Sequence, residues 1–314
     1  MELNFRLWRF GESIALRGLM NAASATGDPE PLTYSLALLR AYLASGVGKS
    51  PVEHVAPATE LLLAFSSTGD DAFLRAARRR AQLHESFPCN TSGAKLHRSD
   101  LSGWDRQIWV DCMDVDAPFL ARLGALTGED QYFDQSAQEA IAYARALQDD
   151  ATGLFYHGFE EYCGRNGQVW ARGNGWAMMG LVETLKFLPK PTSHYNELRQ
   201  RLVSQCQSLA KYQDSEGLWH TLLIQPQTYL ESTLATMAAY ALREAFDAGI
   251  LDESEFGYME KKARAAAMRL IAEDGTLQLV SDATPVGEPG MYASRPFGIF
   301  PWGQGALLLL VTQE

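Results

Sequence analysis

The sequence predicts an all-α fold, an (α/α)6 barrel in which helical hairpins close into a ring. Two short phrases recur along the chain, and alanine- and leucine-rich segments with helical apolar spacing lie between them. A helical hairpin cannot bury its apolar face alone, so repeated hairpins must stack in a line or close into a ring. An open stack needs polar caps at both ends. The last segment, Gly305 to Val311, is almost purely apolar, which favours the ring.

The two recurring phrases mark the ends of the predicted hairpins. In the first, an apolar helix end is followed by threonine, glycine and an acid, at residues 26–28, 68–70 and 127–129. Its glycine supplies a left-handed helix end, and its acid caps or charges the start of the next helix. The second is a glycine, a short apolar run and often a histidine. We expect its loops to gather at one end of the ring; they are residues 93–97, 153–157, 217–220 and, faintly, 275–279.

The segments with helical spacing give the individual elements. We predict helices near residues 10–25, 32–45, 52–67, 70–86, 108–126, 130–148, 172–187, 194–212, 229–248, 254–272 and 302–312. Proline, glycine and asparagine separate them, and only the short runs after Gly153, Gly217 and Gly275 suit small hairpins. Six pairs need one helix more, so we expect the first helix to be absent or reduced to residues 1–7. We expect residues 1–314 to form a single domain.

Composition and charge restrict the function. The net charge is −11 and no basic run outweighs the acids, which argues against a nucleic-acid partner. The arginines of residues 75–80 alternate with alanines in a helical pattern and are predicted to lie on a solvated face. No signal peptide, membrane span, metal motif or cofactor motif is visible, so we expect a cytoplasmic protein without metal or cofactor. Four scattered cysteines are predicted to be reduced: Cys89, Cys112, Cys163 and Cys206.

The stretch from Val169 to Trp176, V-W-A-R-G-N-G-W, is the strongest candidate for a ligand site. Trp170 and Trp176 bracket Arg172, and two glycines lie beside an asparagine between them. Aromatic faces around a fixed cation, with glycines that let a ligand approach the backbone, suit a sugar ring that carries a carboxylate. The alternative is a helix start with both tryptophans in the core and the arginine reaching out to water.

Asp111 is the candidate acid. It lies in the predicted helix I-W-V-D-C-M-D-V-D-A-P-F-L, from Ile108 to Leu120, where it shares a face with Asp114 while Asp116 points elsewhere. Apolar neighbours would desolvate its carboxyl group, which favours the protonated form that a general acid needs. The alternative is an acid bonded to backbone amides in the first turn of a helix.

Histidines in the predicted loops are weaker candidates. His157, His220 and the pair Glu53–His54 could each bind a substrate, or satisfy a loop carbonyl, which for a lone histidine is the commoner case. We expect them at the mouth of the ring. Three further tryptophans are predicted to pack in the core: Trp8, Trp104 and Trp219.

Five motifs follow one another along the chain. They are W-V-D-C-M around Asp111, G-L-F-Y-H-G at 153–158, W-A-R-G-N-G-W at 170–176, G-L-W-H at 217–220 and Y-L-E-S-T-L-A-T-M at 229–237. This succession resembles the unsaturated glucuronyl and rhamnogalacturonyl hydrolases, glycoside hydrolase families 88 and 105. The resemblance runs from about Trp8 to the end of the chain. It implies a six-pair α/α barrel, in agreement with the ring expected from the repeat.

The resemblance also implies a substrate and a mechanism. The family acts on oligosaccharides whose non-reducing sugar is a 4,5-unsaturated uronate left by a polysaccharide lyase. An aspartic acid protonates the double bond at C4, water adds at C5, and the resulting hemiketal opens and releases the neighbouring sugar. Asp111 matches the acid/base position, His157 and Arg172 match substrate-contacting positions, and Trp170 and Trp176 match aromatic positions of the pocket.

The chain departs from the family pattern at two matched positions. Where the family usually has a second aspartate, in D-x-I-N, this chain reads Glu53-His54-Val55-Ala56, and the basic residue after the first histidine is Arg98 instead of lysine. We predict Glu53 as the second catalytic residue, and Arg98, His54 and His220 as further substrate-binding residues. The expected partner is a small acidic oligosaccharide. The alternatives are a catalytically impaired sugar-binding member of the fold, a polysaccharide lyase and a sugar epimerase.

Overall fold

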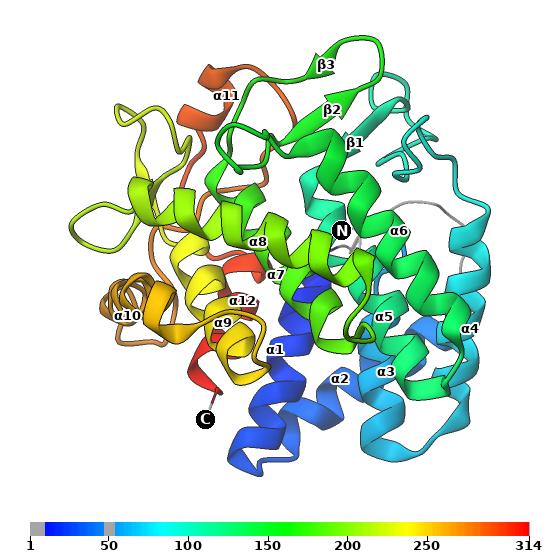
Figure 1. Ribbon diagram of the computed structural model, residues 1–314. Helices are drawn as coiled ribbons and strands as arrows, with labels where there is room; N and C mark the ends of the chain where they lie inside the picture. The colour runs from blue at the N-terminus through cyan, green and yellow to red at the C-terminus, as the bar shows by residue number, and fades with distance from the viewer. Residues whose placement is uncertain (1–9, 47–53, 314) are drawn as a thin grey trace.

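The inner wall of the fold is a closed ring of helices. The computed structural model describes residues 10–46 and 54–313 (Figure 1). The last inner helix packs against both its predecessor and the first, which closes the ring. In the order in which each packs against the next, the inner helices are α1 (Phe10–Thr26), α3 (Ala58–Thr68), α5 (Asp116–Thr127), α7 (Ala171–Phe187), α9 (Thr233–Asp247) and α12 (Pro301–Val311).

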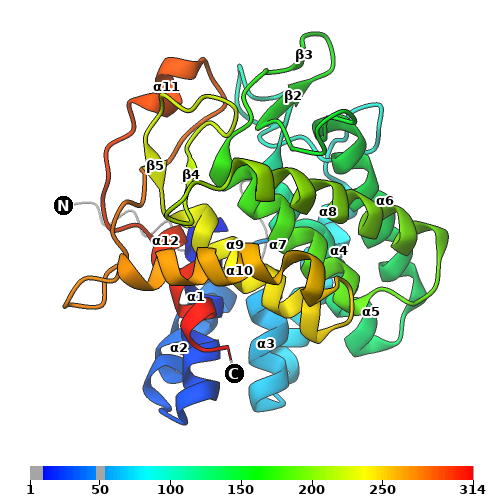
Figure 2. The ribbon, with the colours of Figure 1, turned by 60° about the vertical axis from the view of Figure 1, so that its left-hand side comes forward.

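A second layer of helices covers this wall from outside, as Figure 2 shows for α8 and α10. Each outer helix follows an inner helix and packs against it, so the predicted alternation of hairpins is confirmed. The expected remnant of a first helix, together with Trp8 and Glu53, lies outside the described residues. The outer helices are α2 (Glu30–Ser45), α4 (Asp71–Glu85), α6 (Asp130–Leu147), α8 (Ser193–Tyr212) and α10 (Glu253–Arg269).

The threonine–glycine–acid turns end three inner helices as predicted. Gly27, Gly69 and Gly128 have φ angles of 73°, 69° and 72°, in the left-handed region that a residue without Cβ adopts most easily. The acid after the second of these glycines, Asp70, caps α4 by accepting a hydrogen bond from Ala72 N (3.0 Å).

Short strands occupy the other end of the ring, at the top of Figure 1, together with the short helix α11. One antiparallel sheet has the order β1–β2–β3, and a second joins β4 to β5. The predicted hairpins are therefore confirmed after Gly153 and Gly217. The elements at this end are β1 (Gln107–Trp109), β2 (Gly158–Glu160), β3 (Gly164–Arg165), β4 (Trp219–His220), β5 (Leu230–Glu231) and α11 (Pro289–Ala293).

One predicted helix, near residues 108–126, is wrong in its first half. The chain there forms β1, then the 3-10 helix η1 (Val110–Asp114), and only then α5. Ile108 pairs with Phe159 of β2, which extends the backbone before the corner. Pro118 lies in the first turn of α5, where proline is tolerated, whereas a helix from 108 would place it in the interior.

The first and last described helices meet through glycines. A Cβ atom on Gly18 of α1 would lie 2.8 Å from the carbonyl oxygen of Gly305 in α12, so the two backbones approach too closely for any other residue. Near the start of α1, a Cβ atom on Gly11 would lie 2.8 Å from the ring of Trp302. We call this contact between α1 and α12 the seam.

The cysteines, one arginine of α4 and the lengths of the helices bear on three further predictions. The four cysteines are free, as predicted. Arg80 corrects the solvated-face prediction for residues 75–80: its side chain is buried and donates to the carbonyl oxygens of His54 and Val55, because α4 turns this arginine toward the ring. Within residues 10–46 and 54–313, none of the helices has the length and apolarity that crossing a bilayer requires.

Candidate active site

A cavity of about 570 Å³ lies where the N-terminal ends of α1, α7 and α12 meet η1 and the loops. A second hollow, of about 530 Å³, lies between α4 and α6 and contains none of the predicted site residues. The first cavity is therefore the candidate active site. Its wall consists of Gly11, Glu12, His97, Arg98, Leu101, Trp104, Trp109, Asp111, Trp170, Arg172, Ala283, Thr284, Pro285 and Trp302.

Asp111 lies in this wall, at the corner where β1 passes into η1. The pairing of β1 with β2 and a hydrogen bond from Val110 N to His157 O (2.9 Å) hold the corner in place. The Asp111 side chain is 3% exposed, and its Oδ2 lies 3.2 Å from Nε2 of His157. A buried acid that faces both a histidine and a cavity can exchange a proton with a bound ligand.

A hydrogen-bond chain determines which nitrogen of His157 carries its proton. Tyr292 Oη lies 2.7 Å from His157 Nδ1, and it accepts from Asn166 Nδ2 (3.1 Å) and from the backbone N–H of Gly287 (3.4 Å). Because both amides can only donate, the tyrosine gives its own proton to Nδ1. Burial lowers the pKa of His157, although Asp111 opposes this, so the ring is neutral. Its proton is then on Nε2, facing Asp111.

Arg172 is bound on several sides. Its terminal nitrogens donate to Glu231 Oε1 (3.0 Å), to the carbonyl and hydroxyl oxygens of Ser281 (2.9 and 2.8 Å) and to the carbonyl oxygen of Asp282 (2.8 Å). Its guanidinium carbon lies 4.5 Å from the centre of the Trp170 ring. Burial lowers the pKa of Arg172, and Glu231 opposes this. Arg172 thus ties α7 to the segment that continues into the cavity wall, and Glu231 balances its charge.

Four tryptophans give the cavity flat apolar faces. Trp109, Trp170, Trp302 and Trp104 all belong to its wall. The His97 ring stacks on Trp109 with 3.9 Å between ring centres and 10° between planes. Trp104 packs against the core, as predicted, but its side chain is partly exposed and also lines the cavity. Flat faces of this kind, with a few polar groups between them, suit the ring of a sugar.

The structure brings five of the predicted site residues together. Asp111, Trp170, Arg172 and Arg98 line the cavity, and His157 lies against Asp111. Glu53 lies outside the described residues, so its catalytic role stays a prediction. The remaining three are not among the residues that line the cavity: Trp176, His54 and His220.

Each of these three has another environment. Trp176 belongs to α7 and is fully buried, in agreement with the alternative that placed this tryptophan in the core. His220 Nδ1 lies 2.5 Å from the carbonyl oxygen of Thr228, the loop contact that is the commoner fate of a lone histidine. His54 Nδ1 lies 2.5 Å from Asp116 Oδ2, below the cavity wall. Trp219 is fully buried, as predicted.

The expected common face for Asp111 and Asp114 is not formed. Residues 110–114 make a 3-10 turn instead of an α-helix, and the turn sends the two carboxylates in different directions. Asp114 accepts a hydrogen bond from Arg17 inside the ring, whereas Asp111 faces the cavity.

Sequence reasoning missed three residues of the site. His97 was visible as the histidine of the first glycine phrase, residues 93–97, although no role was assigned to it. Trp302 and Tyr292 gave no local signal, because only the closure of the ring brings the last fifth of the chain to the cavity.

Comparison with known proteins gives matches over almost the whole chain. The family described as Glycosyl Hydrolase Family 88 matches residues 3–314. The chain is 28% identical over 313 residues to the unsaturated rhamnogalacturonyl hydrolase YesR of Bacillus subtilis. This alignment covers 97% of this chain and 89% of that protein.

Solved structures share the fold. A crystal structure of a possible GH105 family member from Klebsiella pneumoniae superimposes with a TM-score of 0.89 and 28% identity, over 97% of this chain and 81% of the other. The unsaturated glucuronyl hydrolase of Bacillus sp. GL1 gives a TM-score of 0.75 with 17% identity, over 98% and 86% of the two chains. The helical ring and the resemblance drawn from the motifs are both confirmed. The chain belongs to glycosyl hydrolase family 88 and is a glycoside hydrolase.

Proposed function

We propose that this glycoside hydrolase removes a 4,5-unsaturated uronic acid from the non-reducing end of short oligosaccharides produced by polysaccharide lyases. The observation that carries the proposal is the position of Asp111, a buried acid in the wall of a tryptophan-lined cavity. The name of the Bacillus subtilis relative, an unsaturated rhamnogalacturonyl hydrolase, supports the same substrate class.

In the proposed reaction, Asp111 gives its proton to C4 of the unsaturated sugar, and positive charge develops at C5 and the ring oxygen. The Nε2–H of His157, 3.2 Å from Asp111 Oδ2, stabilises the aspartate that remains. Water adds at C5 and returns a proton to Asp111, which is restored for the next cycle. The hemiketal then opens and releases the neighbouring sugar with its hydroxyl group intact.

We propose different tasks for the two arginines in the wall. Arg172 already donates to Glu231 and the Ser281 segment, so its main task is to hold Trp170 and the wall in place. Arg98 lines the cavity and is more exposed than Arg172, and it forms an ion pair with Asp100 (2.8 Å). Arg98 is therefore the cation that we assign to the carboxylate of the uronate.

One of the remaining predicted residues keeps its proposed role, and three that were predicted to bind substrate receive another. Glu53 remains our candidate for the second carboxyl group. For Trp176, His54 and His220 we now propose supporting roles through packing and hydrogen bonding, because none of them is among the residues that line the cavity.

The test uses unsaturated disaccharides generated by a lyase, followed by the far-ultraviolet absorbance of the conjugated double bond. Loss of absorbance, with release of the neighbouring sugar, is the expected result. A gain of absorbance on intact polysaccharide would show a lyase instead. Binding of the disaccharide without any change of absorbance would show a sugar-binding protein that has lost catalysis.

We further propose that residues 1–314 act as one catalytic domain and that the protein works in the cytoplasm. The single closed ring supports the first statement. The four free cysteines support the second, because thiols stay reduced in that compartment. Limited proteolysis that yields one resistant fragment, and cell fractionation, test the two statements separately.

A further inference from the structure

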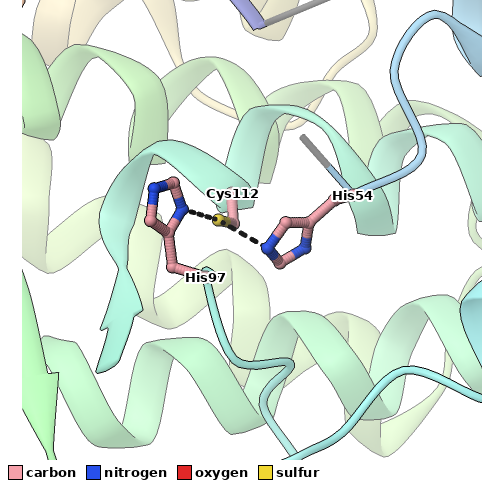
Figure 3. Close-up of side chains that lie close together, drawn as sticks. All are labelled: His54, His97 and Cys112. Atoms are coloured by element: carbon pink, nitrogen blue, oxygen red, sulfur yellow. Dashed lines mark hydrogen bonds between the residues drawn. The ribbon is translucent and has the colours of Figure 1, made fainter. Parts of the chain in front are cut away.

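Three side chains that the proposed reaction does not use meet at the cavity wall, to which one of them, His97, belongs. His54 precedes α3, His97 precedes β1, and Cys112 belongs to η1, so three separate segments contribute one residue each. Figure 3 shows both imidazole rings with a nitrogen directed at the sulfur atom. Cys112 Sγ lies 3.3 Å from His54 Nε2 and 3.5 Å from His97 Nδ1. All three side chains are at most 4% exposed.

The spacing of these atoms fits a tetrahedral metal ion. Zinc binds sulfur at about 2.3 Å and imidazole nitrogen at about 2.0–2.1 Å, so tetrahedral angles place a sulfur and a nitrogen ligand about 3.6 Å apart. The two sulfur–nitrogen distances of 3.3 and 3.5 Å are close to this value. All three ligand atoms lie within 4.8 Å of one another.

The surroundings of His54 orient it as a metal ligand. Its Nδ1 lies 2.5 Å from Asp116 Oδ2, which leaves Nε2 directed at the sulfur. A carboxylate behind the imidazole is the usual outer contact of a metal-binding histidine. Arg80 donates to the backbone carbonyl of His54, and the φ angle of His54 is 55°, a left-handed conformation that a side chain adopts only when its surroundings impose it.

The charges of the cluster also suit a divalent ion. A thiolate at Cys112 and the carboxylate of Asp116 supply two negative charges beside the two neutral imidazoles, so a bound divalent cation leaves this buried site neutral. Without a metal, the same contacts form a hydrogen-bond chain from Asp116 through His54 to Cys112 and His97. In the metal-free state, hydrogen bonds link the three side chains, and in the metal-bound state one ion coordinated by all three replaces these bonds.

We propose that His54 Nε2, Cys112 Sγ and His97 Nδ1 bind one Zn²⁺ ion, with water as the fourth ligand. One thiolate and two imidazoles form a donor set that suits zinc better than calcium or magnesium. No metal motif is visible in the sequence, because the three ligands of the ion come from distant segments. The ion joins two loops to η1, which carries Asp111, so its task is to fix the corner of the cavity. This inference does not rest on the identity of the sugar.

The test measures binding of the metal alone. The two exposed thiols are first removed by Cys89→Ser and Cys163→Ser, so that adventitious binding at the surface does not contribute. We expect one equivalent of Zn²⁺ to remain after dialysis, measured by elemental analysis. Co²⁺ in its place should give a thiolate-to-cobalt charge-transfer band, which appears only when sulfur is a ligand.

The variants separate the proposed site from any other. Cys112→Ser in this background should lose both the equivalent of zinc and the charge-transfer band. The matched control is Cys206→Ser, which removes the other buried thiol, on α8. It should keep both signals. Sub-stoichiometric zinc in the parent protein, or a full equivalent in Cys112→Ser, would overturn the proposal.

Two further measurements keep the test decisive if Cys112→Ser folds poorly. His97→Gln should also abolish stoichiometric zinc, and Asp116→Asn should weaken the affinity about 10- to 100-fold, as loss of an outer contact does. Added Zn²⁺ should raise the Tm of the parent protein and leave the Tm of His97→Gln unchanged. Equal Tm shifts in both proteins would contradict the proposal.

Discussion

Asp111 and Asp114, three residues apart on η1, belong to two regions with opposite character. Asp111 faces the cavity and one neutral histidine, and it forms no ion pair with an arginine or lysine of residues 10–46 and 54–313. Asp114 lies inside the ring, bonded to Arg17, whose Nε is also 3.3 Å from Glu60. Both aspartates are almost completely buried, so burial alone does not distinguish a reactive acid from a structural one.

The inner region is a network of paired charges. Burial raises the pKa of Asp114 to about 6, although Arg17 opposes this. Glu183 shows the opposite balance: burial alone would raise its pKa, but Lys186 and Arg122 lower it to about 2. Lys186 belongs to the same helix as Glu183, whereas Arg122 belongs to the neighbouring inner helix α5. Asp111, by contrast, forms no ion pair with an arginine or lysine of the described residues, and it faces the space in which a substrate would bind.

Asp111→Asn should have the largest effect on the cavity side of this comparison. The amide keeps the shape of the side chain but cannot donate an acidic proton, so we expect kcat to fall about 10²- to 10⁴-fold. Binding of the unsaturated disaccharide should change little, which calorimetry can measure. A variant that keeps a near-normal rate would show that another group supplies the proton.

Arg17→Met tests the inner region. It leaves Asp114 and Glu60 buried without their cation, so we expect a loss of about 3–5 kcal/mol in the free energy of unfolding at pH 7. The loss should be smaller at pH 5. Without Arg17, the folded-state pKa values of both acids rise further, so the folded variant binds more protons than the unfolded variant. The stability of the variant therefore falls as pH rises. Urea unfolding at the two pH values measures this.

The matched control for Arg17→Met is Arg243→Met, which removes an arginine paired with the exposed Asp247. Surface pairs contribute little, so its loss should stay below about 1 kcal/mol. Similar losses for the two variants would mean that the inner charges are no more important than those on the surface.

Glu183→Gln should reveal the pH dependence of the inner network. A folded-state pKa of about 2, against an ordinary value of 4.5, corresponds to about 3 kcal/mol of stability, which is present above the unfolded-state pKa. This contribution is lost as pH falls from about 4.5 toward 2. The difference in unfolding free energy between wild type and variant should therefore be large at pH 7 and vanish near pH 2. A constant difference would contradict the lowered pKa.

Tyr292→Phe should have the smallest effect. It removes the proton donor to His157 Nδ1, worth about 1 kcal/mol, and we expect kcat to fall about fivefold with KM unchanged. Tyr143→Phe is the control, because it also removes a buried hydroxyl, one that donates to the carbonyl oxygen of Lys95 (3.0 Å). That variant should lose stability but keep kcat. Equal kcat values in all three proteins would refute the assigned proton position.

Most of the ring could be predicted from the sequence, because a helix of 3.6 residues per turn and a glycine turn both leave local marks. The error at residues 108–126 had a visible signal, since Pro118 belongs in a first turn. The strand that precedes η1 had none, because β1 exists only through its pairing with β2, fifty residues away.

The candidate site was predictable where one motif holds several of its residues, as for Trp170 and Arg172. It was not predictable where separate segments meet. Trp302 enters the cavity from the last inner helix, and the three proposed zinc ligands come from segments that are neighbours only in the folded ring. Family resemblance identified Trp176 with the pocket, but the packing of α7 places it in the core.

The seam between α1 and α12 has a consequence for how the protein matures. Gly11 and Trp302 both line the cavity, so the wall of the candidate site joins residues almost three hundred positions apart. Contacts between residues so far apart in the sequence require closure of a long loop, which slows folding. A ligand that binds only when α1 and α12 are in contact stabilises the closed ring by mass action. Substrate should therefore make separation of α1 from α12 less favourable.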